Sequence, residues 1–332
     1  MKALTLTAIK SPLELRDREE LSPKPGELVI RLKAAALNRR DYWITQGMYP
    51  GIAPPVVLGS DGSGVVTSYS ECTNPNSVGR EVIIDPGLDW GRDPRAQADG
   101  FNILGLPSDG TFANEVCVPA CNVHEKPEHL DWHQAAALPL AGVTAWRALF
   151  TQGELAGGGT VLISGIGGGV ASFALQFATA VGANVWVTSS SDEKIARATE
   201  RGALGGFNYT NSNWAKEASA AGVAPDVIID SAGGSGYGSL LGLAAPGARI
   251  VNYGATAGPP EKLDLFKVFW KQLRILGSTM GSPSDFRAML DFVNEHEITP
   301  LIDTVMPLAD GNEAIEFMQS SPQFGKYVLA ME

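Results

Sequence analysis

Glycines crowd a short segment of the chain directly after the apolar residues 160–163. The segment contains Gly165, Gly167, Gly168, Gly169 and Val170. Glycines at a turn from a strand into a helix let the backbone approach a pyrophosphate, and the helix offers free N–H groups and the positive end of its dipole. These residues therefore have the chemistry to bind the pyrophosphate of a dinucleotide.

The neighbouring segments decide the interpretation, because the spacing Gly165-x-x-Gly168-x-x-Ala171 departs from the strict Gly-x-Gly-x-x-Gly pattern. An apolar helix is expected over 172–181 and a second strand over 184–188, at the distance that a βαβ unit requires. We interpret the segment as a dinucleotide-binding loop, and the alternative is a tight turn with a purely structural role.

The residues after the second strand indicate which dinucleotide binds. A site for NAD places Asp or Glu there, to accept hydrogen bonds from the ribose 2′-hydroxyl. This chain has Ser189 and Ser190, which can donate to a 2′-phosphate, and Lys194 follows one helical turn later. The pattern favours NADP(H) as cofactor. The same residues also suit the cap of a helix, and the two roles are compatible.

The composition of the 332 residues is that of a globular protein long enough for two domains, with 44% hydrophobic and 18% charged residues. A net charge of -11 argues against nucleic acid or an anionic membrane as a partner. The first residues lack the apolar core of a signal peptide, and no apolar run approaches the ~20 residues of a membrane span. Three cysteines suit a reducing compartment, so we expect a cytoplasmic protein that acts on a small-molecule substrate.

Strand-like segments separated by proline and glycine fill residues 1–125, whereas helices and strands alternate from about residue 131. In the first part, strands are expected over 2–6, 28–36, 56–68, 81–84 and 112–118, and a helix over 38–46. In the alternating part, strands are expected over 160–163, 184–188, 227–230, 249–254 and 273–278, and helices over 133–138 and 142–152. A helix over 284–295 and a strand over 326–330 end the chain. Such alternation predicts a parallel, doubly wound sheet.

Several motifs accompany this layout and together resemble the medium-chain dehydrogenase/reductase superfamily over essentially the whole chain. They lie at residues 36–41, 59–66, 110–113, 135–145, 230–234 and 325–326. The resemblance implies an α/β fold in which a doubly wound parallel Rossmann sheet is joined to a β-rich GroES-like catalytic domain, with a cleft between them for the nicotinamide. It assigns residues 1–125 to the GroES-like domain, 126–281 to the NADP-binding Rossmann domain and 282–332 to a return into the catalytic domain. It also implies a homodimer formed through the last Rossmann strand, 274–278.

Zinc-dependent members of the superfamily polarise an alcohol or carbonyl oxygen with a metal ion held by Cys and His side chains. Matched segment by segment, the ligand positions fall on Asn38, Ser60 and Leu140, which cannot bind zinc as a thiolate or an imidazole does. The region that matches the structural zinc lobe, 86–108, contains no cysteine. We therefore expect neither a catalytic nor a structural zinc ion.

One other group of residues has the composition of a Cys2His2 site. It contains Cys117, Cys121, His124, His129 and His133. We favour structural roles for them, because the first cysteine fits a strand, prolines interrupt the segment, and the last two histidines straddle the start of a helix.

Without a metal ion to polarise a carbonyl oxygen, a conjugated carbonyl is the more suitable substrate. Hydride can add to the β-carbon of a conjugated carbonyl while charge moves onto an oxygen held by hydrogen-bond donors. Residues 37–43 and 55–62 resemble the zinc-lacking branch of quinone oxidoreductases, enoyl reductases and "zinc-type alcohol dehydrogenase-like" proteins. We expect an NADPH-dependent, zinc-independent oxidoreductase that reduces a quinone or an α,β-unsaturated carbonyl. The alternatives are a metal-free carbonyl reductase or alcohol dehydrogenase, and a catalytically altered NADPH-binding protein in a biosynthetic pathway.

Four residues are candidates for catalysis. Asn38 occupies the former ligand position and can donate to a substrate oxygen, and its alternative role is that of a loop-capping amide. Tyr42 and Tyr49 are nearby phenols that could supply a proton or simply shape the mouth of the site. The resemblance implies that Thr144 begins a helix that faces the nicotinamide.

The resemblance also adds contacts to the cofactor. The expected residues are Asn252, Tyr253, Gly254, Met280, Gly281 and Ser282 beside the nicotinamide, Tyr209 near the 2′-phosphate, and Lys326. For Lys326 two roles stay open, a contact to a cofactor phosphate and a cap on the last strand.

Overall fold

The computed structural model describes residues 1–320 and 323–331, and the chain divides into two compact units. Unit 1 comprises Met1–Ala141 and Ser282–Glu332, and unit 2 comprises Gly142–Gly281. The sequence analysis placed the first boundary after residue 125 instead. Helix α2 (Trp132–Ala137) accounts for the difference, because it packs on strands β3, β5 and β18 of unit 1.

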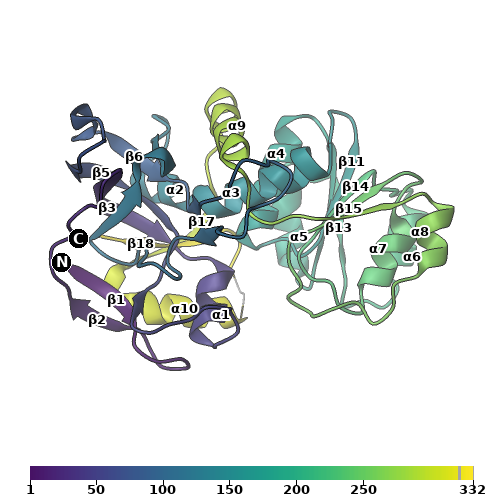
Figure 1. Cartoon of the computed structure of the whole chain (residues 1–332). Coiled ribbons are helices and arrows are strands. Elements are labelled where there is room, and N and C mark those ends of the chain that lie inside the picture. The colour runs from purple at the N-terminus through teal and green to yellow at the C-terminus, as the bar shows by residue number, and fades with distance from the viewer. Residues whose placement is uncertain (321–322, 332) are drawn as a thin grey trace. The chain divides into compact units, whose positions relative to one another are not determined.

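Unit 1 is built mainly on a sheet in the strand order β10-β6-β5-β3-β18-β17, with β9 also paired to β3 (Figure 1). Its strands are antiparallel except β17 and β18, which pair in parallel. A smaller sheet has the order β2-β1-β4, and β7 pairs with β8. The strands are β1 (Lys2–Leu6), β2 (Glu14–Asp17), β3 (Glu27–Ala36), β4 (Val56–Val57), β5 (Asp61–Tyr69), β6 (Glu81–Ile84), β7 (Gly87–Leu88), β8 (Asn102–Ile103), β9 (Glu115–Pro119), β10 (Val123–Glu125), β17 (Ile302–Pro307) and β18 (Lys326–Ala330). Besides α2, the unit contains α1 (Arg39–Thr45), α9 (Pro283–Glu295) and α10 (Gly311–Ser320).

A break in one expected strand positions several polar residues. The segment 56–68 forms β4 and β5 separately, because Gly59 between them has a φ of 94°. A Cβ added to Gly59 would lie 2.4 Å from the ring of Phe112, so only glycine fits there. The backbone of residues 110–112 pairs with residues 57–59, which is why β9 begins at Glu115 and not at Phe112. The break places Ser60 and Asp61 at the start of β5.

Strand pairing and aromatic packing stabilise the lobe at residues 86–108. Strands β7 and β8 pair within it, and the buried Trp90 packs edge-on against Phe101 with 5.2 Å between the ring centroids. The indole N–H of Trp90 donates to the carbonyl of Asp93 at 3.0 Å. The aromatic pair and this hydrogen bond therefore help to hold the lobe together.

Unit 2 contains a parallel sheet in the order β13-β12-β11-β14-β15-β16. Its strands are β11 (Thr160–Ile163), β12 (Asn184–Ser189), β13 (Gly205–Asn208), β14 (Val227–Asp230), β15 (Arg249–Asn252) and β16 (Arg274–Gly277). Its helices are α4 (Gly169–Ala180), α5 (Asp192–Thr199), α6 (Trp214–Ala220), α7 (Tyr237–Leu243) and α8 (Leu265–Trp270), and α3 (Pro139–Trp146) runs across the unit boundary into a π-helix (Arg147–Gln152).

This strand order reverses direction between β11 and β14, which is the topology of a Rossmann sheet. The central strands are buried on both faces, as a sheet covered by helices on two sides requires. The expected α/β fold class is therefore confirmed. Ligands of such sheets bind at the carboxyl ends of the strands, beside the reversal. Among the helices that the structure describes, none combines the length and apolar composition needed to cross a bilayer.

Candidate functional site

The glycine loop lies where a Rossmann sheet binds its ligand, between β11 and α4. Gly165 and Gly167 have φ angles of 67° and 118°, in the region that glycine favours. Gly168 is the N-cap of α4 and supplies no side-chain hydrogen bond, and a Cβ added there would meet no atom within 4 Å. The N–H groups of the first turn, at Gly169 and Val170, therefore have no side-chain cap and suit an anion. The loop fits the pyrophosphate of a nicotinamide dinucleotide.

The end of β12 gathers the residues expected to read the ribose. Ser189 is buried, and its Oγ accepts the N–H of Ser191 at 3.2 Å. Tyr209 lies beside it because β12 and β13 pair in parallel, and the Tyr209 N–H donates to the Ser189 carbonyl at 2.9 Å. Ser190 is exposed. Lys194 lies in the first turn of α5, and its N–H donates to Oγ of the N-cap Ser191 at 3.3 Å. Side chains from two adjacent strands thus meet at one strand end.

Two residues at this strand end, Asn208 and Asp192, were not among the predicted site residues. Asn208 donates from Nδ2 to the Asp192 carboxylate at 2.9 Å. The pairing of Ser189 with Asn208 brings them together, and a pattern read along one strand does not contain this information. Asp192 is a negative charge near the proposed 2′-phosphate position, so it opposes the effect of Lys194.

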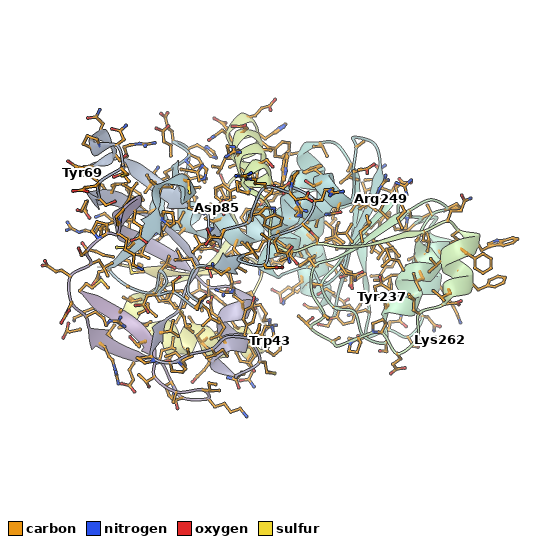
Figure 2. All side chains as sticks on the ribbon, in the orientation of Figure 1. Trp43, Tyr69, Asp85, Tyr237, Arg249 and Lys262 are labelled. Atoms are coloured by element: carbon orange, nitrogen blue, oxygen red, sulfur yellow. The ribbon has the colours of Figure 1, made fainter. Side chains whose placement is uncertain are left out.

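A buried carboxylate organises the carboxyl ends of the central strands. Asp230 accepts hydrogen bonds from Ser164 Oγ at 2.6 Å, Asn252 Nδ2 at 3.0 Å and the Gly233 N–H at 2.9 Å. Tyr237, labelled in Figure 2, donates from its hydroxyl to Asn252 Oδ1 at 2.7 Å. The network joins β11, β14 and β15, and it therefore fixes the loops on which a nicotinamide site depends. The sequence analysis quoted Asp230 in a motif but assigned it no role.

Burial shapes the acidity of the two phenols in this region. It raises the pKa of Tyr237, and it raises the pKa of Tyr253 to about 12. Tyr253 also donates its N–H to the Asp230 carbonyl at 3.0 Å. Both phenols are therefore neutral at physiological pH, and Tyr253 is a backbone element of the same network. Gly254 follows it directly.

Thr144 and Met280 lie together in unit 2, although 136 positions separate them in the sequence. Thr144 Oγ1 is 4.0 Å from Met280 Sδ, and both side chains are buried. Met280 has a φ of 47°, which is unusual for a residue other than glycine. Ser282 follows Gly281 and caps α9, with its N–H and Oγ both donating to the Asp285 carboxylate at 2.8 and 2.7 Å. The contacts of Ser282 are those of a helix cap, a role that the sequence analysis did not consider.

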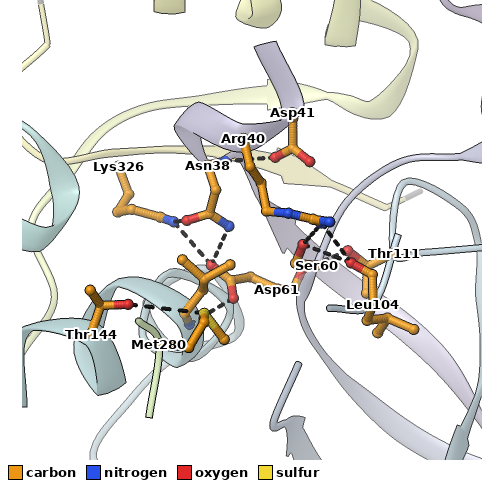
Figure 3. A network of polar contacts seen from close by, with 11 residues as sticks. Asn38, Arg40, Asp41, Ser60, Asp61, Leu104, Thr111, Thr144, Met280 and Lys326 are labelled. Carbon is orange, nitrogen blue, oxygen red and sulfur yellow. Dashed lines mark hydrogen bonds and ion pairs between the residues drawn. The ribbon is translucent and has the colours of Figure 1, made fainter. Parts of the chain in front are cut away.

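Unit 1 contains a closed cluster of three polar side chains (Figure 3). Lys326 Nζ donates to Asn38 Oδ1 at 2.6 Å and to Asp61 Oδ2 at 3.0 Å. Asn38 Nδ2 donates to the same Asp61 oxygen at 2.9 Å, and Asp61 Oδ1 accepts the N–H of Leu140 at 2.8 Å. Lys326 and Asp61 have side-chain exposures of 4% and 0%, so this is a buried ion pair. The structure thus gives Lys326 partners that the sequence analysis did not foresee for it.

Asp41 lies next to this cluster, in the first turn of α1. Its Oδ2 accepts the N–H of Asn38 at 2.7 Å, whereas Oδ1 is buried and has no hydrogen-bond partner among the described residues. Burial raises the pKa of Asp41 to about 6, and the positive charge of Arg40 opposes that effect only in part. Asp41 is therefore a buried carboxylate that loses its charge in mild acid.

Arg40 supplies a second buried cation. Its Nη1 donates to Ser60 Oγ at 2.7 Å and to the Leu104 carbonyl at 2.9 Å. Ser60 stands at the position matched to a metal-binding histidine, and it is held by this guanidinium and by its own bond to Leu104 at 2.8 Å. The contact ties the lobe at 86–108 to the start of β5. Arg40 was not among the predicted site residues.

The two tyrosines proposed as proton donors are held by ring contacts. Tyr49 lies with its ring 5.2 Å from the guanidinium carbon of Arg40. Tyr42 packs at a tilt against Trp43 with 5.1 Å between centroids. Both tyrosines are partly buried; Tyr42 lies on α1, Tyr49 follows that helix, and both pack against an apolar core cluster of unit 1.

The cysteine and histidine group is engaged in separate contacts. His124 packs on Phe286 with 4.8 Å between centroids, and burial lowers the pKa of His124 to about 4. His129 Nε2 lies 3.2 Å from the carbonyl of Ile298, and Cys117 lies on β9. Within residues 1–320 and 323–331, no three His, Cys, Asp or Glu side chains group as ligands of a metal ion would.

Comparison with known families agrees with the fold. The family described as alcohol dehydrogenase GroES-like domain matches residues 24–128, and the family described as zinc-binding dehydrogenase matches residues 169–295. The chain belongs to the medium-chain dehydrogenase/reductase superfamily and is an enzyme of this oxidoreductase family.

Individual relatives cover nearly the whole chain. The "zinc-type alcohol dehydrogenase-like protein YogA" of Leptosphaeria maculans is 37% identical, over 96% of this chain and 94% of that protein. The quinone oxidoreductase of Pseudomonas aeruginosa is 31% identical, over 84% of this chain and 82% of that protein. A solved structure named NAD-dependent alcohol dehydrogenase is 36% identical, covers 100% of both chains and superposes with a TM-score of 0.94.

Proposed function

We propose that the chain is an NADPH-dependent, zinc-independent oxidoreductase that reduces a quinone or an α,β-unsaturated carbonyl by direct hydride transfer. The observation that carries the proposal is the cluster of Asn38, Asp61 and Lys326, in which an amide stands at a position matched to a metal ligand and accepts a hydrogen bond from a buried ammonium. Hydrogen-bond donors stabilise negative charge on a carbonyl oxygen most effectively when water is excluded. The similarity to a quinone oxidoreductase supports this substrate class.

A bound reduced nicotinamide would supply the hydride, and the residues of this chain would do the rest. The glycine loop of unit 2 would bind the pyrophosphate through the N–H groups of α4. The amide of Asn38 would donate a hydrogen bond to the substrate oxygen as charge develops on it. Tyr42 or Tyr49, or water, would then supply the proton that completes the reduction. Further cofactor contacts would come from Thr144, Asn252, Tyr253, Gly254, Met280 and Gly281.

The preference for NADP(H) rests on the end of β12. Ser189 and Ser190 carry hydroxyls where NAD-specific sites carry a carboxylate, and Lys194 adds a positive charge. Asp192 opposes this preference, although its bond to Asn208 fixes the carboxylate at 2.9 Å from that amide. The solved structure at 36% identity is named NAD-dependent. The proposed preference for NADP(H) therefore depends on the residues of this chain and not on that similarity.

The test follows oxidation of NADPH and NADH by the purified protein at 340 nm. The substrates are a quinone, an enone and the saturated ketone that matches the enone. We expect turnover with NADPH and the quinone or the enone, and slow turnover with the ketone. Preference for the ketone would favour a carbonyl reductase, and binding of NADPH without turnover would favour a non-catalytic protein. Either result would refute the proposed reaction.

We also propose a homodimer formed through β16. This strand ends the sheet and pairs on one side with β15 only, and Ile275 on it is 39% exposed. Helix α8 buries none of its residues, and Phe266 and Trp270 on it are 65% and 74% exposed. A sheet edge can pair with its own copy about a two-fold axis, and an apolar patch of this kind marks an interface.

Light scattering after size exclusion tests the dimer. Trp270→Glu and Ile275→Glu should shift the protein to a monomer, because each buries a charge in the expected interface. Leu204→Glu is the matched control, since Leu204 is 58% exposed and precedes β13 at the opposite edge of the sheet. A monomeric wild type would refute the proposal. Three free thiols, two of them exposed, are compatible with the cytoplasmic location that we also propose.

A further inference from the structure

The register of three adjacent strands builds the cluster in unit 1. Strand β3 lies between β5 and β18. It pairs Ala36 with Asp61 on one side and Ala36 with Val328 on the other. Continuing the antiparallel register by two residues places Lys326 opposite Asn38. Asn38 is thus held between an anion on β5 and a cation on β18.

The hydrogen bonds of the cluster fix the orientation of the Asn38 amide. Its oxygen accepts from Lys326, and one of its N–H groups donates to Asp61. A flipped amide would place N–H groups against the ammonium and the oxygen against the carboxylate, so only one orientation is compatible with both neighbours. The second amide proton of Asn38 has no acceptor among the described residues.

A buried ion pair is weak evidence for a role in stability, because desolvation cancels much of its attraction. Its effect on a neighbouring dipole is different. The ammonium of Lys326 withdraws electron density from the Asn38 carbonyl, and this strengthens the amide as a hydrogen-bond donor. Where water is excluded, the effective dielectric constant is low. The charge of Lys326 is therefore weakly screened at the short distance to the Asn38 amide.

We propose that Lys326 is a positioning residue for the reduction, acting through the Asn38 amide. Its ammonium would orient that amide and polarise it, so that the free amide proton stabilises charge on the substrate oxygen. Lys326 would thereby supply the positive charge that a metal ion supplies in zinc-dependent members of the superfamily. This inference rests on the proposed function, and it replaces the two roles that the sequence analysis considered for Lys326.

The test removes the charge without leaving a buried carboxylate unpaired. Lys326→Met combined with Asp61→Asn makes the pair neutral, whereas Lys326→Met alone would strand the Asp61 charge. We expect kcat to fall about 10- to 100-fold, less than the full loss of a direct oxyanion donor. The KM for substrate and the Kd for NADPH should stay within about twofold, and Lys326→Arg, which keeps a positive charge with a different shape, should lose less turnover than the neutral pair.

A double-mutant cycle separates this role from a structural one. In an Asn38→Leu background the same pair of substitutions should change kcat less than about twofold, because the amide through which Lys326 acts is gone. The matched control is Lys126→Met with Glu81→Gln, a second largely buried lysine of unit 1 whose pair has an N–O distance of 3.4 Å. This control should leave kcat unchanged.

Several results would overturn the inference. Wild-type kcat in the neutral pair would show that the charge has no effect, and an equal loss in the Asn38→Leu background would show that Lys326 acts independently of the amide. Weaker NADPH binding with unchanged kcat would assign Lys326 to the cofactor. If the neutral pair fails to fold, Lys326→Gln with Asp61→Asn keeps polar contacts without charge, and it should show the same loss of kcat. A wild type that turns over no substrate overturns the proposed function first.

Discussion

Replacing Asp41 by asparagine should change how stability depends on pH, because Asp41 is a buried carboxylate with one unpartnered oxygen. Its pKa is about 6 in the folded protein, against an ordinary value of 3.8. The folded state therefore holds a proton on Asp41 at pH values where the unfolded chain has released it. Stability from this group is present below about pH 4 and is lost as the pH rises through 6.

The size of the effect follows from the two pKa values. Their difference corresponds to about 3 kcal/mol when both limits are reached. Between pH 7 and pH 5, the linkage relation gives the wild type a gain of about 1.3 kcal/mol relative to Asp41→Asn. At pH 4 the gain grows to about 2.4 kcal/mol. This free energy needs no reduction for screening by solvent, because the Asp41 side chain is completely buried.

The assay is urea unfolding of both proteins in parallel from pH 7 to pH 4. Other titrating groups are shared, including Asp85, whose pKa burial raises to about 7, so they cancel in the difference. Asparagine keeps an oxygen that can accept the Asn38 N–H. Asp17→Asn is the control, because Asp17 lies on the exposed strand β2 and its carboxyl meets water in both states.

The reasoning is refuted by a difference that stays flat with pH. It is also refuted by a wild type that loses stability relative to Asp41→Asn on acidification. The second result is the behaviour of a carboxylate whose ionised form is favoured by folding. In that case Arg40 would outweigh burial as the main influence on Asp41.

Three other substitutions or treatments test separate parts of the description. Ser189→Asp should weaken NADPH binding and improve tolerance of NADH, and an unchanged ratio of the two Kd values would mean that the ribose-reading position lies elsewhere. Trp90→Ala should destabilise unit 1 by about 3–5 kcal/mol in denaturant unfolding, whereas Met48→Ala, at a side chain that is 59% exposed, should change stability by less than about 0.5 kcal/mol. Elemental analysis should find no stoichiometric zinc, and turnover should survive treatment with a chelator; its loss would contradict the metal-free reaction.

The Rossmann unit was largely predictable because its signals are local. The glycines of the loop, the apolar strand before it and the helix after it lie within a stretch of about twenty residues. Helix α4 begins at Gly169, a few residues before the expected start, and Gly168 is its N-cap. Alternation of helices and strands was sufficient to give the parallel sheet.

Several features of unit 1 could not be predicted from sequence patterns. The expected strand over 56–68 is broken at Gly59, which has a φ of 94° and has no room for a Cβ beside Phe112, and a hydrophobic pattern does not reveal this conformation. Lys326 and Asn38 lie 288 positions apart, and they meet only because β18 pairs with β3 in one register. A shift of one residue would turn Lys326 to the other face of the sheet. Motif matching identified Asn38, but it could not identify its neighbours.

The charges around Asn38 connect the two main experiments. Lys326 and Arg40 bring two buried positive charges, and Asp61 and Asp41 bring two carboxylates, one of which titrates near pH 6. Above that pH the four charges sum to zero, and below it the set carries one net positive charge. An oxyanion on the substrate would therefore meet a more favourable field when Asp41 is protonated. The stability measurement on Asp41 reports the pH at which Asp41 takes up its proton. Below that pH, one negative charge that opposes the effect of Lys326 on the Asn38 amide is gone.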